Sequence, residues 1–217
     1  MSDPPAAQEV TFALRNPHPK PNTDPTNTTG TRERTLETLL HRTLRSLILT
    51  QAHPRTLIQV TLQIVSTPES SSSVAPVPQS ASYLPPLPHL LHTALLALLN
   101  SNIPLVKTCT AALIAVLDPG GPVESEVGEI CTFPTAAQIM LARSLHVFAY
   151  SSTAEMILVE SEGEFDAEVW DRVAVVAEAV CRGGEVTGGD AGRGLDGWLR
   201  GVVGEEVGRA GRWRGNL

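Results

Sequence analysis

The feature that most constrains the fold is a helix pattern that runs directly into a strand pattern, over residues 32–65. In its first part the apolar residues recur at spacings of three and four, which places them on one side of an α-helix. They are Leu36, Leu39, Leu40, Leu44, Leu47 and Ile48. After a break at residues 51–54, apolar and polar residues alternate, which puts Ile58, Val60, Leu62 and Ile64 on one face of a strand and Gln59, Thr61 and Gln63 on the other. The pattern predicts a helix packed on a sheet that is covered on one side.

The opposite side of this helix is charged. Arg34, Glu37, His41 and Arg45 form a second stripe at helical spacing, with Arg42 beside it. A basic stripe can bind phosphate groups. The alternative is an ordinary solvated face with one internal pairing among its Arg, Glu and His side chains.

The rest of the chain alternates between helix and strand patterns. We predict strands over residues 10–14, 106–117, 129–133, 139–150 and 155–160, and helices over residues 89–100 and 167–181, the latter capped by Asp166. A turn at residues 134–137 joins two of the strands. Residues 195–207 keep a helical period that Gly197, Gly201, Gly204 and the following Gly208 weaken. The fold class is therefore α/β in the wider sense that includes α+β.

Two stretches have the composition of mobile loops. Residues 17–30 are rich in Pro, Asn, Thr, Asp and Gly, and residues 66–88 contain six prolines and four consecutive serines. We expect one domain over residues 1–182, followed by a Gly/Arg-rich segment over residues 183–217 with a possible helix.

Charge is distributed unevenly within the net charge of −7. Residues 1–110 carry eight basic and six acidic side chains, whereas residues 111–217 carry eight and seventeen. A polyanion would meet the first half and be repelled by the second, which argues against a free-standing nucleic-acid-binding protein. Because aromatic residues make up only 4% of the chain, a surface that stacks on bases is not expected either.

Cys109, Cys131 and Cys181 have no metal-type spacing, and their odd number fits poorly with a disulfide framework. We expect small buried thiols in a reducing compartment. The chain has no secretory leader pattern and no apolar run long enough to cross a bilayer, so we expect a soluble intracellular protein.

Local motifs indicate no particular chemistry. There is no phosphate-binding loop motif, nucleophile elbow or metal-ligand cluster. His89 and His92 lie three apart on a predicted helix, but without a neighbouring carboxylate or thiol they are expected to be ordinary helix histidines and not metal ligands. The carboxylates between residues 155 and 171 are explained by solvation or by a helix N-terminus.

Several stretches together resemble the RNase PH family, above all its inactive eukaryotic branch in the ring of the RNA exosome. They are Glu37-Thr-Leu-Leu-His-Arg-Thr-Leu-Arg, Pro54-Arg-Thr-Leu-Ile-Gln-Val-Thr-Leu-Gln-Ile, His92-Thr-Ala-Leu-Leu-Ala-Leu-Leu-Asn-Ser-Asn-Ile-Pro-Leu, Phe133-Pro-Thr-Ala-Ala-Gln and Glu162-Gly-Glu-Phe. Their order and spacing agree with the family. The resemblance implies a β-α-β fold like domain 2 of ribosomal protein S5, without the strands that usually come first. It also implies a pseudo-hexameric ring that threads RNA through a central channel.

Two departures from active relatives imply that catalysis is lost. Active members bind phosphate with a Gly-Thr-Arg-type loop, and the corresponding residues 66–88 contain no glycine, lysine or arginine. Active members also carry paired aspartates where this chain has Ile130-Cys-Thr-Phe-Pro-Thr-Ala-Ala-Gln. Phosphorolysis requires charge stabilisation at the phosphate and acid or metal help at the leaving oxygen.

The resemblance thus favours a non-catalytic ring subunit that needs no cofactor or metal. Its expected partners are other RNase PH-like ring subunits, S1/KH cap subunits and RNA, in the nucleus, the nucleolus and the cytoplasm. Arg32, Arg34, Arg42 and Arg45 are the candidate RNA contacts. The alternatives are a phosphorolytic 3′-to-5′ exoribonuclease that acts as a homo-oligomer and a free RNA-binding module.

Overall fold

A computed structural model describes residues 10–15, 28–64, 82–118, 128–184 and 194–212; of residues 10–15 and 28–32 it describes the backbone alone. The elements in chain order are β1 (Val10–Arg15), α1 (Thr28–Leu47), the 3₁₀-helix η1 (Thr50–Ala52), β2 (Ile58–Gln63), α2 (Leu87–Asn100), β3 (Cys109–Leu117), β4 (Glu129–Thr132), α3 (Ala136–Leu141), β5 (Ala142–Ser151), β6 (Met156–Gly163), α4 (Ala167–Arg182) and α5 (Leu195–Gly211).

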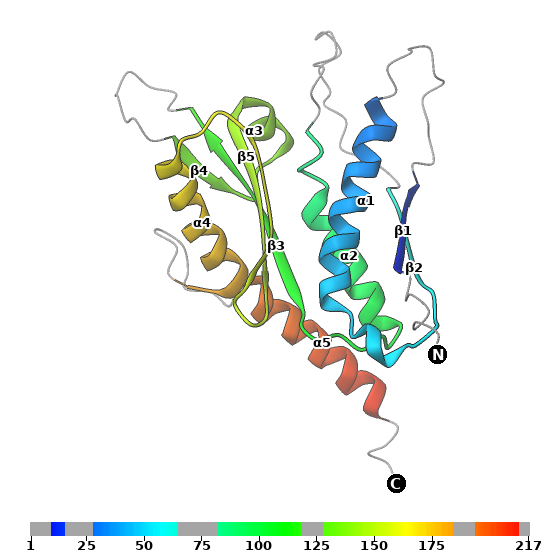
Figure 1. The fold of residues 1–217 in the computed structure, drawn as a ribbon. Helices are drawn as coiled ribbons and strands as arrows, with labels where there is room; N and C mark the ends of the chain where they lie inside the picture. Colours follow the sequence, from blue (N-terminus) through cyan, green and yellow to red (C-terminus); the bar gives the residue numbers. More distant parts are fainter. Residues whose placement is uncertain (1–9, 16–27, 65–81, 119–127, 185–193, 213–217) are drawn as a thin grey trace, which may run out of the picture.

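The elements form layers (Figure 1). β1 and β2 form a two-stranded parallel sheet, and the other strands form an antiparallel sheet in the order β4-β3-β5-β6. α1 and α2 lie between the two sheets, and α4 covers the far face of the antiparallel sheet. This mixed architecture confirms the predicted fold class.

The first unit is the predicted helix and strand, completed by β1. β1 pairs with β2 in parallel, with Val10 opposite Ile58, and a parallel pair needs a crossover, which α1 supplies. β2 alternates as predicted, because Ile58, Val60 and Leu62 are buried whereas the residues between them are exposed. The polar face of β2 therefore points to solvent.

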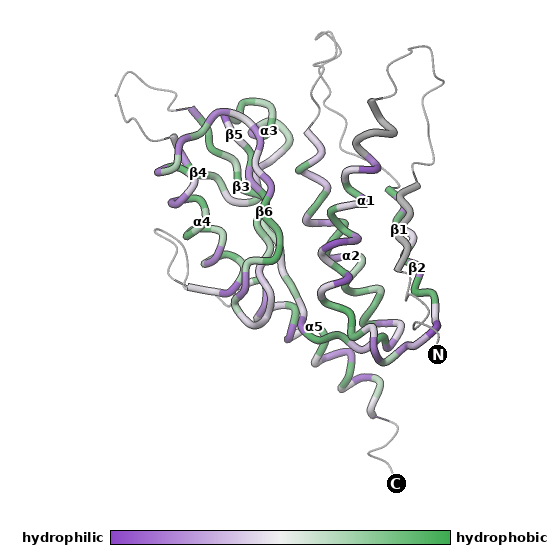
Figure 2. The backbone as a smooth tube through the Cα atoms, viewed as in Figure 1, coloured by the Kyte–Doolittle hydropathy of each residue, from purple (hydrophilic) through white to green (hydrophobic). Residues whose placement is uncertain are grey.

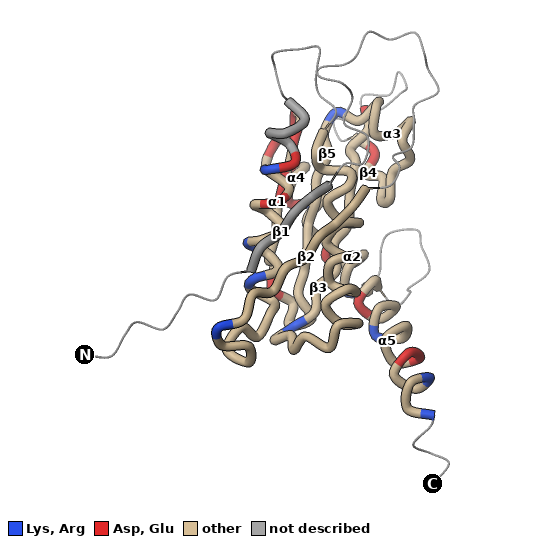
Figure 3. The backbone as a smooth tube through the Cα atoms, turned by 90° about the vertical axis from the view of Figure 1, so that its right-hand side faces the viewer, with Lys and Arg blue, Asp and Glu red and all other residues tan. Residues whose placement is uncertain are grey.

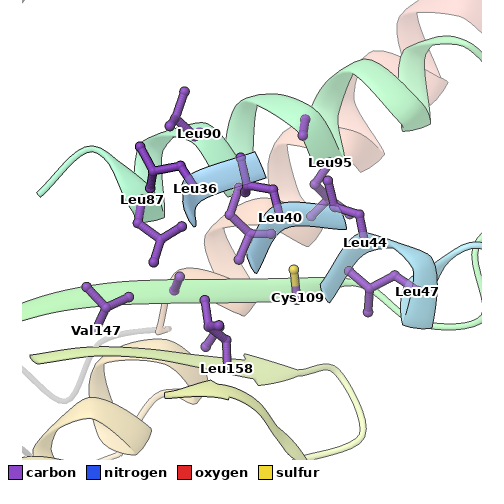
Figure 4. Packing of buried hydrophobic residues seen from close by; sticks show 14 of the residues in the cluster. Leu36, Leu40, Leu44, Leu47, Leu87, Leu90, Leu95, Cys109, Val147 and Leu158 are labelled. Atoms are coloured by element: carbon purple, nitrogen blue, oxygen red, sulfur yellow. The ribbon is translucent and has the colours of Figure 1, made fainter. Parts of the chain in front are cut away.

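The main hydrophobic core lies where α1 and α2 face the antiparallel sheet. α1 contributes Leu36, Leu40, Leu44 and Leu47, and Val147 and Leu158 approach them from β5 and β6 (Figure 4). Figure 2 shows hydrophobic residues along both helices and along the sheet that they face. The predicted helix over residues 89–100 is confirmed as α2, and seven of its fourteen residues are buried.

β3 is the central strand that its continuous apolar sequence predicts, although it begins at Cys109 and not at residue 106. Its residues alternate between two cores: Cys109, Ala111, Leu113 and Ala115 face the main core, and Ala112, Ile114 and Val116 face a second core under α4. A strand covered on both faces has no polar side to show, which explains the uninterrupted apolar run.

The turn predicted at residues 134–137 is wrong, as is the start of the following strand at residue 139. The short helix α3 occupies Ala136–Leu141, and β5 begins only at Ala142. Thr135 accepts a hydrogen bond from the Gln138 backbone N–H, and the Gln138 side chain accepts one from the Thr135 N–H. This reciprocal capping favours a helical turn that hydrophobic periodicity alone does not reveal.

The predicted loops are too long at their ends. α1 begins at Thr28, inside the predicted loop 17–30, and α2 begins at Leu87, inside the predicted loop 66–88. Pro88 is tolerated because the first helical turn leaves its backbone nitrogens unbonded in any case. Leu84 and Leu87 are fully buried, which fixes this end of the second loop. Residues 16–27 and 65–81 lie outside the described part of the chain.

The possible helix after residue 183 exists as α5. Leu199 is buried in the main core, and Leu195 packs against the second core. The distal half of α5 extends away from the body (Figure 1). The domain boundary at residue 182 stays a prediction. No described helix is both long enough and apolar enough to cross a membrane.

Candidate nucleic-acid interface

Three of the four candidate RNA contacts lie on the exposed side of α1. Its core-facing leucines fix the rotation of the helix, and the opposite side turns Arg34, Arg42 and Arg45 to solvent. At a rise of roughly 1.5 Å per residue, the distance along the axis from Arg34 to Arg45 is about 16 Å. The fourth candidate, Arg32, belongs to α1, but its side chain lies outside the described part.

The guanidinium groups of these three arginines take no part in the ion pairs found among the described side chains, which join Lys107 to Glu155 and link charged residues along α4 and α5. Glu37 and His41, on the same stripe, do have interaction partners. The basic stripe therefore comprises fewer side chains than the sequence pattern predicts. The exposed side chains of this stripe that can bind anions are the three arginines.

The two histidines of α2 lie in different surroundings. His89 is exposed, whereas His92 Nε2 accepts a hydrogen bond from the Ala111 backbone N–H at 2.8 Å. β4 pairs with β3 only from Ile114 onward, so this N–H lies on a stretch of β3 edge that the short β4 does not reach. Burial, and to a smaller extent His89, lowers the pKa of His92, which favours the neutral form that can accept the bond. His92 is an ordinary structural histidine, as predicted.

The cysteines are free thiols, and two of them are buried. Burial raises the pKa of Cys109 and of Cys181 to about 12. Such thiols stay protonated and unreactive near neutral pH. Cys131 on β4 is only half-buried, so the expectation of burial is met by two of the three.

A buried polar array on β5 and β6 is not evident from the sequence. His146 is fully buried and lies opposite Ser161 in the strand register. Its Nε2 is 2.9 Å from Ser144 Oγ, and its Nδ1 is 2.9 Å from Ser161 Oγ. Desolvation lowers the pKa of His146 to about 4, so the ring is neutral near pH 7. Alternation along β5 places Ser144, His146 and Phe148 on one face, which is the only sequence signal for the array.

Two carboxylates on β6 face the main core. Glu160 and Glu162 lie opposite Val147 and Leu145, and cross-strand partners point to the same face of a sheet. Glu160 accepts a hydrogen bond from the Tyr83 hydroxyl at 3.1 Å, and burial, followed by the charge of Glu160, raises the pKa of Tyr83. Glu162 Oε2 is buried without a hydrogen-bond partner in the described part.

The prediction that solvation explains the carboxylates of this region is therefore wrong for Glu160 and Glu162. It holds for Glu155, which is exposed and paired with Lys107, and the helix N-terminus accounts for Asp166. Glu160 and Glu162 differ from the other carboxylates of this region because alternate residues of β6 face the main core. Among the described residues, no group of three or more His, Cys, Asp or Glu side chains is placed to hold a metal ion.

Comparison with known proteins indicates relatives of this chain and of its fold. Residues 3–104 match the family model for RNase PH, described as 3′ exoribonuclease family, domain 1. Over 158 residues the chain is 27% identical to the exosome complex component RRP46 of Saccharomyces cerevisiae. Residues 3–104 of the chain are thus similar to RNase PH proteins. The match covers 70% of this chain, which spans 64% of the length of the yeast protein.

The RNase PH-like fold is also found in a solved structure. The crystal structure of Rrp46 from rice (Oryza sativa) superposes with a TM-score of 0.54 at 19% sequence identity, covering 79% of this chain and 68% of the rice chain. The exposed arginines of α1 lie within the segment that matches RNase PH domain 1, whereas His146, Glu160 and Glu162 lie beyond it.

Proposed function

We propose that this RNase PH-like chain is a non-catalytic structural subunit of the ring of an RNA exosome. In this role it supports 3′-to-5′ RNA processing and degradation by holding neighbouring subunits and by forming part of the RNA channel. The observation that carries the proposal is the similarity to the yeast exosome component, which extends over 70% of the chain.

The residue content at the positions of the family's catalytic groups supports the absence of catalysis. Residues 66–88 contain no cation to bind inorganic phosphate, and residues 130–138 contain no carboxylate. β4 and α3, which carry most of the latter stretch, present neutral side chains such as Cys131, Thr132 and Gln138. A phosphorolytic centre requires positive charge at the phosphate and an acid or a metal at the leaving oxygen.

The exposed arginines Arg34, Arg42 and Arg45, together with Arg32, are the proposed RNA contacts of this subunit. A row of guanidinium groups binds phosphates without sequence preference, which suits a channel that passes RNA of any sequence. The proposed partners are other RNase PH-like ring subunits and S1/KH cap subunits. The proposed locations are the nucleus, the nucleolus and the cytoplasm.

The second candidate function is that of a phosphorolytic 3′-to-5′ exoribonuclease acting as a homo-oligomer. Glu160 and Glu162 favour it, because two carboxylates on one face of β6 could supply acid chemistry that the sequence pattern does not suggest. We rank it second because a cation for inorganic phosphate is missing from residues 66–88.

Two measurements separate these functions. A tagged full-length chain expressed in its own cells should co-purify with other RNase PH-like chains, identified by mass spectrometry. The purified chain alone should release no nucleoside diphosphates from single-stranded RNA when inorganic phosphate is supplied. Recovery of the chain as a solitary species, or release of diphosphates that Glu162→Gln abolishes, would reject the structural role.

A further inference from the structure

The basic surface of α1 continues beyond the end of the helix. After Leu47 the chain passes through η1 and reaches Arg55, whose side chain is exposed. Backbone hydrogen bonds from Thr50 N–H to Ile48 carbonyl oxygen (2.9 Å) and from His53 N–H to Thr50 carbonyl oxygen (3.1 Å) hold this turn compactly at the foot of α1. Arg55 follows this turn in the chain, between α1, whose last turn carries Arg45, and the start of β2 at Ile58.

Acidic residues are confined to the beginning of this surface. Glu33 and Glu37 lie beside Arg34, whereas residues 38–68 contain no aspartate or glutamate. Figure 3 shows the acidic segments of α1 near its start and basic segments along its length. In a protein of net charge −7, the second half of α1 and the following turn are thus a local region of positive charge, formed by Arg42, Arg45 and Arg55.

The backbone at Arg55 also differs from that of an ordinary loop residue. Its φ of 60° lies in the left-handed region, which is less favourable for a residue with a side chain than for glycine. Folding stability alone would favour glycine or asparagine here. An arginine held in this conformation and exposed to solvent is consistent with a role of its side chain outside the fold.

This region offers no means of recognising bases by stacking. Residues 28–57, which comprise α1 and the turn, contain no phenylalanine, tyrosine or tryptophan. Base-independent contact with phosphate oxygens is what a row of arginines without aromatic neighbours provides.

We propose that the RNA contact of this chain is centred on the second half of α1 and the following turn, and that Arg55 binds RNA phosphate together with Arg42 and Arg45. This inference rests on the proposed function as an RNA-contacting subunit. It deepens that function by centring the contact on this region and by adding Arg55.

The test is the salt dependence of RNA binding by the complex that co-purifies with the tagged full-length chain. Fluorescently labelled poly(U) and poly(A) oligonucleotides are titrated at salt concentrations from about 50 to about 200 mM. The variants are Arg55→Gln and the double variant Arg42→Gln/Arg45→Gln. The matched control is Arg172→Gln, which removes an exposed positive charge from α4 on the other side of the molecule.

Arg55→Gln should make the negative slope of log affinity against log salt shallower by about 0.7, the value for one phosphate contact on a single strand. The change should be equal for both oligonucleotides. Arg172→Gln should leave the slope unchanged. The variant Arg55→Gly, which also removes the charge but relieves the left-handed strain, should lose affinity while gaining stability. If Arg55→Gly instead lost both affinity and stability, the loss of affinity would reflect a folding defect.

Two results would overturn the inference and are distinguishable from failure of the proposed function. If the α1 double variant lowers the slope and Arg55→Gln does not, Arg55 is outside the contact while the RNA role survives. If poly(U) and poly(A) respond differently to Arg55→Gln, recognition is not restricted to the backbone. If neither α1 variant nor Arg55→Gln changes the slope, the RNA contact proposed for this chain is itself wrong.

Discussion

At the scale of single residues, burial determines which polar side chains shape the fold and which remain available to a partner. His146 is fully buried between two serine hydroxyls, and its ring also lies edge-on to Phe165 at a centroid distance of 4.8 Å. His92 accepts a bond from a strand N–H. Both histidines act within the molecule, whereas Arg42, Arg45 and Arg55 reach solvent.

His146 should make stability depend on pH. Its pKa is about 4 in the folded chain against 6.5 when unperturbed, so the unfolded chain binds more protons between these values. The contribution is complete above about pH 6.5 and is lost as the pH falls toward 4. We expect the free energy of unfolding to fall over this interval by on the order of 2 kcal/mol more in the native chain than in His146→Gln.

Urea denaturation at pH values across this interval measures the effect. His89→Gln is the control, because His89 is exposed and its substitution should leave the pH dependence in place. Equal pH dependence in the native chain and in His146→Gln would show that the ring is not held neutral by burial.

At the scale of elements, capping side chains determine where a helix begins, and the free space around a glycine determines whether a larger residue can replace it. Asp166 accepts a hydrogen bond from the Val169 N–H at 2.8 Å and starts α4. α5 has no side-chain cap and contains several glycines, so it depends on its contacts with the body.

Replacing Asp166 by alanine should destabilise the protein by about 1 kcal/mol, because an N–H of the first turn of α4 loses its acceptor. Asp171→Ala, an exposed site within the same helix, should change stability by less than about 0.5 kcal/mol. Thermal unfolding followed by circular dichroism compares the two variants. Equal melting temperatures would show that the cap contributes nothing.

Two glycines should respond in opposite directions to alanine. A Cβ at Gly204 of α5 would meet nothing within 4 Å, so Gly204→Ala should stabilise the protein by roughly 0.5–1 kcal/mol. Gly163 has φ of 106°, and a Cβ there would lie 2.3 Å from the Arg143 carbonyl oxygen. Gly163→Ala should therefore be destabilising. Chemical denaturation of both variants checks the signs, and a shared sign would contradict the argument.

At the scale of the whole molecule, two cores on the two faces of one sheet are joined by the central strand β3. Helices α1 and α2 close the main core, and α4 closes the second. α5 contacts both, through Leu199 and Leu195. We infer that the chain unfolds as one cooperative unit that includes α5.

Leu199→Ala tests this inference. Removing a side chain that is only 6% exposed should cost roughly 2–3 kcal/mol and shift a single unfolding transition followed by circular dichroism. Trp198→Ala, which truncates a 59% exposed neighbour, should have a much smaller effect. If Leu199→Ala leaves the main transition unchanged, α5 unfolds independently and the predicted boundary at residue 182 gains support.

By itself, the sequence determined the elements whose pattern is local and strongly periodic: α1 with its leucine side, the alternating β2, the apolar β3, and α4 with its Asp166 cap. Hydrophobic periodicity suffices for α1, β2 and α4 because one face of each is buried, and β3 is apolar throughout because both of its faces are covered. The sequence also provided the motifs that led to the RNase PH-like fold and the exposed arginines of α1.

Only the tertiary structure decided which polar groups face inward. The His146 array depends on strand register between β5 and β6, and the inward direction of Glu160 and Glu162 depends on the same pairing. α3 depends on a reciprocal cap, and the start of α2 depends on buried Leu84 and Leu87. These features rest on contacts between residues far apart in the chain or on hydrogen bonds of individual side chains, and neither leaves a periodic trace in the sequence.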